Sequence, residues 1–154
     1  MSKLDANNIK IHPTTMTIQK IMNMDITMPD VSFVGDGDHW QKVCKASEVI
    51  ENIIIGLPLR PIWLNAEDDS TYTFITELHV IRSIKDFMNN QFEICISQFL
   101  PAEYYTTFDK LPRHIQRRIE ETVVTVNIID PGTTEAERQD LIKRLTNVAE
   151  IWKG

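Results

Sequence analysis

Apolar residues recur at intervals of three and four between Trp40 and Leu57, and this periodicity constrains the fold more than any other feature. An α-helix brings positions with this spacing onto one face, which must then be buried against other elements. The helix is expected to stop at Gly56 and Pro58, because glycine favours a helix end and proline cannot continue a helix. The chain therefore needs a core that covers one long amphipathic helix.

Strand and helix patterns alternate irregularly along the rest of the chain. They predict strands at residues 25–28, 59–64, 71–75, 92–96 and 123–129, and helices at residues 77–89, 111–121 and 134–148. Thr134 and Glu137 have the spacing of a capping box at the start of the last helix. The order lacks a regular strand–helix–strand rhythm, which predicts an α+β domain. Residues 1–24 are weakly patterned and are expected to form a loosely attached arm or edge segment, and residues 25–154 the domain.

Composition excludes several classes of protein. The 154 residues are 42% hydrophobic and 25% charged, which fits one globular domain. The net charge of −6 excludes a generally basic protein that coats nucleic acid, so DNA binding has no support from net charge. The N-terminus is polar and no apolar run approaches the roughly 18 residues of a membrane span. We therefore expect a soluble, cytoplasmic protein with no membrane contact.

The chain has two cysteines, Cys44 and Cys95, and each lies within an apolar run. Their spacing matches no metal-binding pattern, and two cysteines in an intracellular protein are usually reduced. We expect two buried thiols and no metal site.

Residues 45–64 contain Ser47, Ile50, Glu51, Gly56, Pro58, Pro61 and Ile62. With these residues the segment resembles the N-terminal domain of GmrSD-type, modification-dependent restriction enzymes, which reads Ser-x-x-Ile-Glu-Ser-Ile-Leu-x-Gly-x-Pro-x-Pro-Pro-Ile. The similarity continues in order through residues 71–75, 87–92, 109–112 and 144–145. Such domains are related to the nucleotide-handling fold shared by ParB and sulfiredoxin. The resemblance implies a single ParB-like domain with a small mixed sheet and flanking helices.

The family's central motif is not retained. The motif is Asp-Gly-Gln-Gln-Arg at a strand-to-helix junction, where the glycine permits close approach of the backbone and the arginine pairs with phosphate. The matching positions here are Thr76, Glu77, Leu78, His79 and Val80. A glutamate in place of the glycine and a valine in place of the arginine disfavour phosphate for steric and electrostatic reasons.

Two further family motifs are matched only in part. Trp40 matches a tryptophan that follows a Gln-Arg pair in the family, but residues 35–38 here read Gly-Asp-Gly-Asp. Arg144 matches the arginine of an Arg-x-Asn motif, in which Thr146 replaces the asparagine. The resemblance therefore implies a retained scaffold that has lost its chemistry, which is a pseudoenzyme.

Glu77, His79 and Arg82 are the candidate catalytic residues, at the start of a predicted helix. They would supply an acid, a base and an anion site, together with Arg144 as a ligand-binding residue. The alternative is a solvated helix terminus, with Glu77 near the positive end of the helix dipole.

Arg113 and Arg117 are candidate ligand-binding residues in a basic cluster with His114 and Arg118. Phosphate or DNA binding is one interpretation of this cluster. The i,i+4 spacing of Arg117 and Glu121 favours the other interpretation, a solvated helix face.

We therefore predict a non-catalytic binding or regulatory module, derived from a restriction-type domain that handles nucleotide or DNA. The resemblance implies a setting of defence or mobile elements, and the partner would be another protein or a second copy of the chain. One alternative is a diverged nucleotide hydrolase or nuclease that uses Glu77, His79 and Arg82 with a magnesium-bound nucleotide. A second alternative is a homo-oligomeric interaction module that uses the C-terminal helix near Trp152. No resident cofactor is expected.

Overall fold

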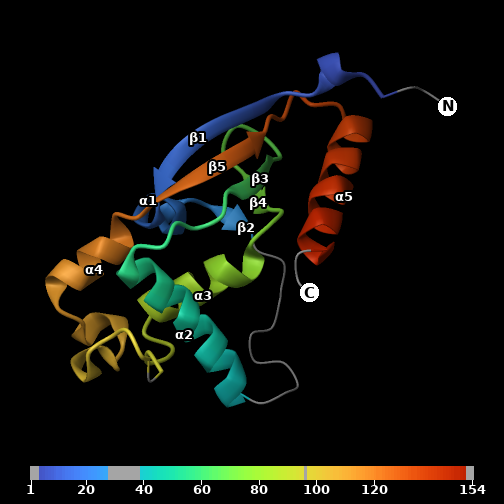
Figure 1. Ribbon diagram of the computed structural model, residues 1–154. Helices are drawn as coiled ribbons and strands as arrows, with labels where there is room; N and C mark the ends of the chain where they lie inside the picture. The colour runs from blue at the N-terminus through green and yellow to red at the C-terminus, as the bar shows by residue number, and fades with distance from the viewer. Residues whose placement is uncertain (1–3, 28–38, 96, 152–154) are drawn as a thin grey trace.

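The computed structural model describes residues 4–27, 39–95 and 97–151, apart from the side chains of residues 39–41 and 147–151 (Figure 1). The strands are β1 (Ile11–Thr17), β2 (Ile26–Thr27), β3 (Ile62–Ala66), β4 (Tyr72–Phe74) and β5 (Val123–Ile129). The helices are α1 (Ile18–Asn23), α2 (His39–Ile55), α3 (Leu78–Met88), α4 (Arg113–Glu120) and α5 (Glu135–Ile151). Short 3-10 turns lie at Ala6–Asn8, Ala102–Tyr104 and Phe108–Lys110.

The five strands form one mixed sheet in the order β1-β5-β3-β4-β2. β1 pairs antiparallel with β5, β5 pairs parallel with β3, β3 pairs antiparallel with β4, and β4 pairs parallel with β2. The register places Met16 opposite Val124 and Leu64 opposite Phe74, so that these apolar side chains share one face. The predicted class, a single α+β domain with a mixed sheet, is confirmed.

The core lies between one face of this sheet and the helices α1 to α4. Its most deeply buried members include Ile18 of α1, Ile50 of α2, Ile84 and Phe87 of α3, Ile119 of α4, and Ile62, Leu64, Val124 and Val126 of the strands. Burying each large aliphatic side chain contributes about 1.5–3 kcal/mol relative to leaving it exposed. α5 stands apart from α2, α3 and α4 in Figure 1. The described side chains that are buried in α5, Glu137 and Arg138, lie near its start.

The α2 helix ends as the sequence predicts. Gly56 follows it with φ +92°, a left-handed conformation that glycine adopts without strain. The Leu57 N–H then donates to the Asn52 carbonyl at 2.9 Å, which satisfies a carbonyl in the last turn of the helix. This helix end fixes the position of the loop that leads into β3.

Of the two expectations for residues 1–24, a loosely attached arm or an edge segment, the structure confirms the edge segment for residues 11–17. Residues 11–23 are an integral part of the domain, so a boundary at residue 24 does not describe them. β1 pairs along the whole of β5 as an edge strand, and α1 buries Ile18 and Ile21 in the core. The apolar pattern is weak because residues 12–15 of this edge strand are all exposed.

The predicted strand at residues 92–96 does not form in residues 92–95, and Ile96 lies outside the described residues. Phe92 and Ile94 are buried, which explains the alternation in the sequence. The Ile94 N–H donates to the Thr106 carbonyl of a loop at 3.2 Å rather than to a strand.

The last helix forms, but Glu137 makes a different contact from the one that a capping box requires. Its Oε1 accepts a hydrogen bond from the Asp5 N–H at 3.0 Å. The acidic side chain therefore connects the N-terminal segment to α5.

Candidate functional site

A cavity of about 290 Å³ lies where α2 ends and α3 begins. It is lined by Val49 and Asn52 of α2, by Leu57, Pro58, Leu59 and Arg60 of the following loop, and by Glu77 and Val80 at the start of α3. α2 and α3 pack side by side, which brings these distant segments together. The cavity occupies the strand-to-helix junction where the sequence resemblance places the family's lost motif.

Glu77 is the residue of the cavity with unusual backbone geometry. It precedes α3 with φ 59° and ψ 31°, in the left-handed region. This conformation costs a residue with a Cβ atom roughly 1–2 kcal/mol, whereas glycine adopts it freely. The strained glutamate therefore lies beside a cavity, at a helix N-terminus whose first N–H groups have no partners within the helix.

The chemistry of the lining is mixed. Five of the eight lining residues are apolar, and the polar ones are Asn52, Arg60 and Glu77. The side chains of Arg60 and Asn52 offer N–H donors, whereas the Glu77 carboxylate and the side-chain oxygen of Asn52 offer acceptors. Such a lining suits a neutral ligand that has both donors and acceptors next to an apolar group.

Of the three candidate catalytic residues, only Glu77 lines this cavity. Arg82 instead pairs with Asp86 one helical turn further on, with Nε and Oδ2 3.2 Å apart. His79 is exposed, and its main-chain carbonyl accepts a hydrogen bond from Ser83 Oγ at 2.8 Å. None of the cavities formed by the described residues alone is lined by all three of Glu77, His79 and Arg82.

Arg144 lies in a different place from Glu77. It is on α5, and its Nε lies 2.6 Å from Oδ2 of Asp140. It lines a separate cavity of about 190 Å³ with Glu137 and residues of the N-terminal segment. The proposed convergence of Arg144 with Glu77 is therefore not found in this structure.

The basic cluster on α4 is divided among different roles. Arg113 pairs with Glu120 at 2.8 Å and also donates to Gln116, whereas Arg117 is exposed. Arg118 donates to the carbonyl of Ile54 at the end of α2. The cluster is therefore spread over an ion pair, an exposed side chain and a helix-end contact.

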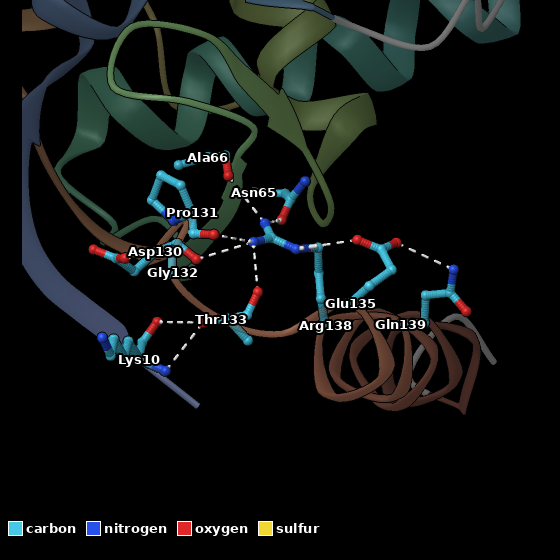
Figure 2. A network of polar contacts seen from close by, with 10 residues as sticks. All are labelled: Lys10, Asn65, Ala66, Asp130, Pro131, Gly132, Thr133, Glu135, Arg138 and Gln139. Atoms are coloured by element: carbon cyan, nitrogen blue, oxygen red, sulfur yellow. Dashed lines mark hydrogen bonds and ion pairs between the residues drawn. The ribbon is translucent and has the colours of Figure 1, made fainter. Parts of the chain in front are cut away.

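Arg138, which sequence reasoning did not identify, is the centre of the polar network in Figure 2. Its side chain is 10% exposed and its guanidinium donates to the side-chain oxygen of Asn65 and to four main-chain carbonyls. These carbonyls belong to Ala66, Asp130, Pro131 and Thr133. Its Nε also lies 3.7 Å from Oε2 of Glu135, in an ion pair within α5. Because its hydrogen-bond partners are carbonyls of the fold itself, Arg138 joins α5 to the ends of β3 and β5.

Sequence reasoning also missed Asn52 and Arg60 as lining residues. The signal was present in the helix pattern, because Val49 and Asn52 are three residues apart and so share a face of α2. The proximity of Asn52 and Arg60 to Glu77 depends on how α2 packs against α3. Spacing along the chain does not reveal this packing.

Cys44 and Cys95 are close together, although they are 51 residues apart in sequence. Their sulfur atoms lie 3.0 Å from each other and both thiols are unbridged. Both residues are half-buried rather than buried, which corrects the expectation of two buried thiols.

Residues 35–38, which were compared with a family motif, and Trp152, which was expected to mark an interaction surface, lie outside the described residues. Within the described ranges, no group of three or more His, Cys, Asp or Glu residues is arranged to hold a metal ion. No helix of this described part is long and apolar enough to cross a membrane. Comparison of the chain with models of protein families, with curated proteins and with solved structures gave no match.

Proposed function

We propose that this chain is a non-catalytic binding module that holds an extended segment of a partner protein at the cavity between α2 and α3. The observation that carries the proposal is the lining, in which Glu77 faces the same cavity as Arg60 among apolar side chains. A peptide segment offers an apolar side chain flanked by N–H donors and C=O acceptors, and this chemistry complements the lining.

The size of the cavity supports a side chain with its neighbouring peptide groups rather than a whole nucleotide. Small-molecule sites usually enclose about 300–1,000 Å³, and this cavity of about 290 Å³ is at the lower limit. Leu57 at its rim is 51% exposed, and the neighbouring Ile55 is also exposed. These two side chains extend the apolar surface beyond the cavity.

The charges of the lining argue against a polyphosphate ligand. Phosphate sites gather several donors of positive charge, whereas Arg60 is the lone cationic residue among the lining residues and Glu77 is anionic. Arg82 and Arg144 pair with acidic residues of their own helices and do not line this cavity. The hydrolase alternative therefore lacks its proposed catalytic groups at this cavity.

We further propose that the module derives from a restriction-type, ParB-like domain and acts in the cytoplasm. Support comes from the left-handed φ of Glu77, because this residue stands where the resembling family has a glycine. The setting in defence or mobile elements is part of the same proposal.

The first experiment separates peptide binding from nucleotide binding. Thermal unfolding is measured with ATP and GTP, each with and without magnesium. A ligand at 100 times its dissociation constant adds about 2.7 kcal/mol to the free energy of unfolding, so a bound nucleotide would raise the melting temperature clearly. We expect no shift. A magnesium-dependent shift that is lost in Glu77→Ala would instead favour the diverged hydrolase.

The second experiment identifies the peptide preference. A phage-displayed library of random peptides is selected on the immobilised protein, and the affinity of the selected peptides is measured by fluorescence anisotropy. We expect Leu57→Ser and Glu77→Lys each to weaken binding by about tenfold or more, which corresponds to about 1.4 kcal/mol.

Val123→Ser is the matched control, because Val123 is also a large exposed side chain, at 61%, but does not line the cavity. It should bind as the wild type does. Equal affinity of the wild type, Leu57→Ser and Glu77→Lys for every selected peptide would overturn the proposal, as would a failure to select any peptide.

A further inference from the structure

A second feature lies on a different face of α2, at the contact between this helix and the segment that follows α3. Cys44, Ser47, Glu48 and Glu51 are spaced along one face of α2 and line a cavity of about 250 Å³. Cys95, Ser97, Gln98 and Phe99 line its other side. This cavity shares no lining residue with the peptide site.

We propose that Cys44 and Cys95 are a redox modification site, where a small-molecule disulfide such as glutathione disulfide converts the two thiols reversibly into an intramolecular disulfide. The proposal rests on the thiol pair and does not depend on the proposed binding function.

The main observation is the short distance between the two sulfur atoms. They lie 3.0 Å apart, and a disulfide bond is about 2.05 Å long. Bond formation therefore needs an approach of about 1 Å, which is within the reach of small side-chain rotations.

Hydrogen bonds from Cys95 and Ser97 to α2 hold these two residues in place. The Cys95 N–H donates to Ser47 Oγ at 2.6 Å, and Ser97 Oγ donates to Glu51 Oε1 at 2.5 Å. Both acceptors are on α2, one and two turns beyond Cys44. The Tyr105 hydroxyl fixes the segment from its other side by donating to the Ser97 carbonyl at 2.7 Å. The two sulfur atoms are therefore positioned by their surroundings.

An oxidant can reach the pair through the cavity. Both cysteines are half-buried, and Phe99 at the edge of the cavity is 71% exposed. The thiols are thus unlike a pair in a sealed core, where access limits oxidation.

The reaction is an exchange in two steps. A thiolate of Cys44 attacks one sulfur of glutathione disulfide, which breaks the S–S bond, forms a mixed disulfide and releases the first glutathione thiolate. The thiolate of Cys95 then attacks the Cys44 sulfur and releases the second glutathione. Both protein protons end on the two glutathione molecules, and the two electrons lost by the protein reduce the glutathione disulfide.

The environment of the Cys95 thiol is consistent with Cys95 acting in the second step. Burial, together with the neighbouring Cys44, raises the pKa of the Cys95 thiol to about 11. Cys95 is therefore almost entirely protonated at neutral pH and is a weak first nucleophile. Modification of Cys44 removes its own contribution to the high pKa of Cys95, which favours the second step.

The test incubates the full chain in glutathione buffers of increasing disulfide content, followed by acid quenching, thiol counting and non-reducing peptide mapping. We expect the thiol count to fall from two to zero, the mass to fall by two hydrogen atoms, and one peptide to link Cys44 with Cys95. The bond closes a loop across 51 residues, so the melting temperature should rise and return to its original value on reduction.

Two variants show whether the geometry directs the reaction. Cys44→Ser should keep one thiol and form only a mixed disulfide with glutathione. Cys44→Ser combined with Lys45→Cys keeps two cysteines but moves one of them to an exposed position around the helix. We expect this double variant to form far less intramolecular disulfide than the wild type.

Three outcomes would overturn the proposal. The first is that the wild type remains fully reduced with glutathione disulfide in large excess. The second is that its disulfides are intermolecular only. The third is that the relocated cysteine forms an intramolecular disulfide as readily as Cys44 does.

Discussion

The guanidinium of Arg118 on α4 donates a hydrogen bond from Nη1 to the carbonyl oxygen of Ile54, 3.0 Å away at the end of α2. The carbonyls of a last helical turn have no partner within the helix, and a cation is favourable there. The contact joins two helices through residues that are 64 positions apart in sequence. Ile54 lies two residues before Gly56 and the loop that lines the cavity at Glu77, so the contact helps to position that loop.

We expect Arg118→Ala to lower the free energy of unfolding by about 1 kcal/mol, because a partly buried, charge-assisted hydrogen bond is lost. Arg117→Ala is the matched control, since Arg117 is an exposed arginine on the same helix without that contact. It should change the free energy of unfolding by less than about 0.5 kcal/mol. Urea unfolding of both variants checks this, and equal effects would show that the Ile54 contact contributes nothing.

Glu77→Gly is expected to stabilise the fold by about 1 kcal/mol, because glycine removes the strain of the left-handed conformation. Asn90→Gly is the comparison, since Asn90 also has a positive φ, 61°, but asparagine tolerates this region better than glutamate does, and its Oδ1 accepts a hydrogen bond from the Asp109 N–H that glycine would lose. Its gain should be smaller. Urea unfolding measures both variants, and a loss of stability in Glu77→Gly would mean that the carboxylate makes a stabilising contribution larger than the strain.

Gly56→Ala tests the opposite change at the end of α2. An added Cβ meets no atom within 4 Å, so crowding plays no part and only the φ of +92° opposes the substitution. We expect the free energy of unfolding to fall by about 1 kcal/mol. Thermal unfolding of the variant is the measurement, and an unchanged melting temperature would show that the loop adapts to a negative φ.

The long helix, the β3–β4 hairpin and β5 were predictable because local patterns determine them. Residues 40–57 have helical periodicity, and six of the seven residues 123–129 are β-branched and five are apolar. β1 was not recognised as part of the domain, because only Met16 of its seven residues is buried. Exposure on an edge strand removes the alternation on which such a prediction depends.

The sites were less predictable, because each depends on contacts between distant segments. The cavity at Glu77 needs α2 to pack on α3, and the Cys44–Cys95 pair joins residues that no motif connects. Arg138 has no special sequence context, yet the turn at Pro131–Gly132 brings several carbonyls toward one point. Glu77 was identified because a family pattern pointed to its position, whereas its left-handed backbone was not foreseen.

Acid should destabilise the protein partly through Asp130. The Gly132 N–H, together with His12 and Lys10, holds the pKa of the Asp130 carboxyl below its usual range. A carboxyl group whose pKa is lowered by folding contributes stability that is complete at neutral pH and is lost as the pH falls through its folded pKa. We therefore expect Asp130→Asn to lower the free energy of unfolding at pH 7.

The difference between the wild type and Asp130→Asn should shrink between about pH 5 and pH 2. Urea unfolding over this range measures both curves. A difference that stays constant with pH would contradict a role for the charge and would indicate loss of hydrogen-bond geometry alone.

Of the substitutions considered, replacement of Arg138 is expected to cause the largest loss of stability. Its removal leaves the Asn65 side chain and four main-chain carbonyls without their donor in a nearly buried position. We expect Arg138→Met to lower the free energy of unfolding by about 3 kcal/mol or more. Arg138→Lys should recover little of this loss, because a single ammonium group cannot span partners arranged around a planar guanidinium.

Arg144→Met is the matched control, because Arg144 is an exposed arginine on the same helix that pairs with Asp140. This variant should lower the free energy of unfolding by less than about 1 kcal/mol. Urea unfolding ranks the three variants. If Arg138→Lys were as stable as the wild type, the fork of hydrogen bonds would not be what attaches α5 to the sheet, and the positive charge alone would be sufficient.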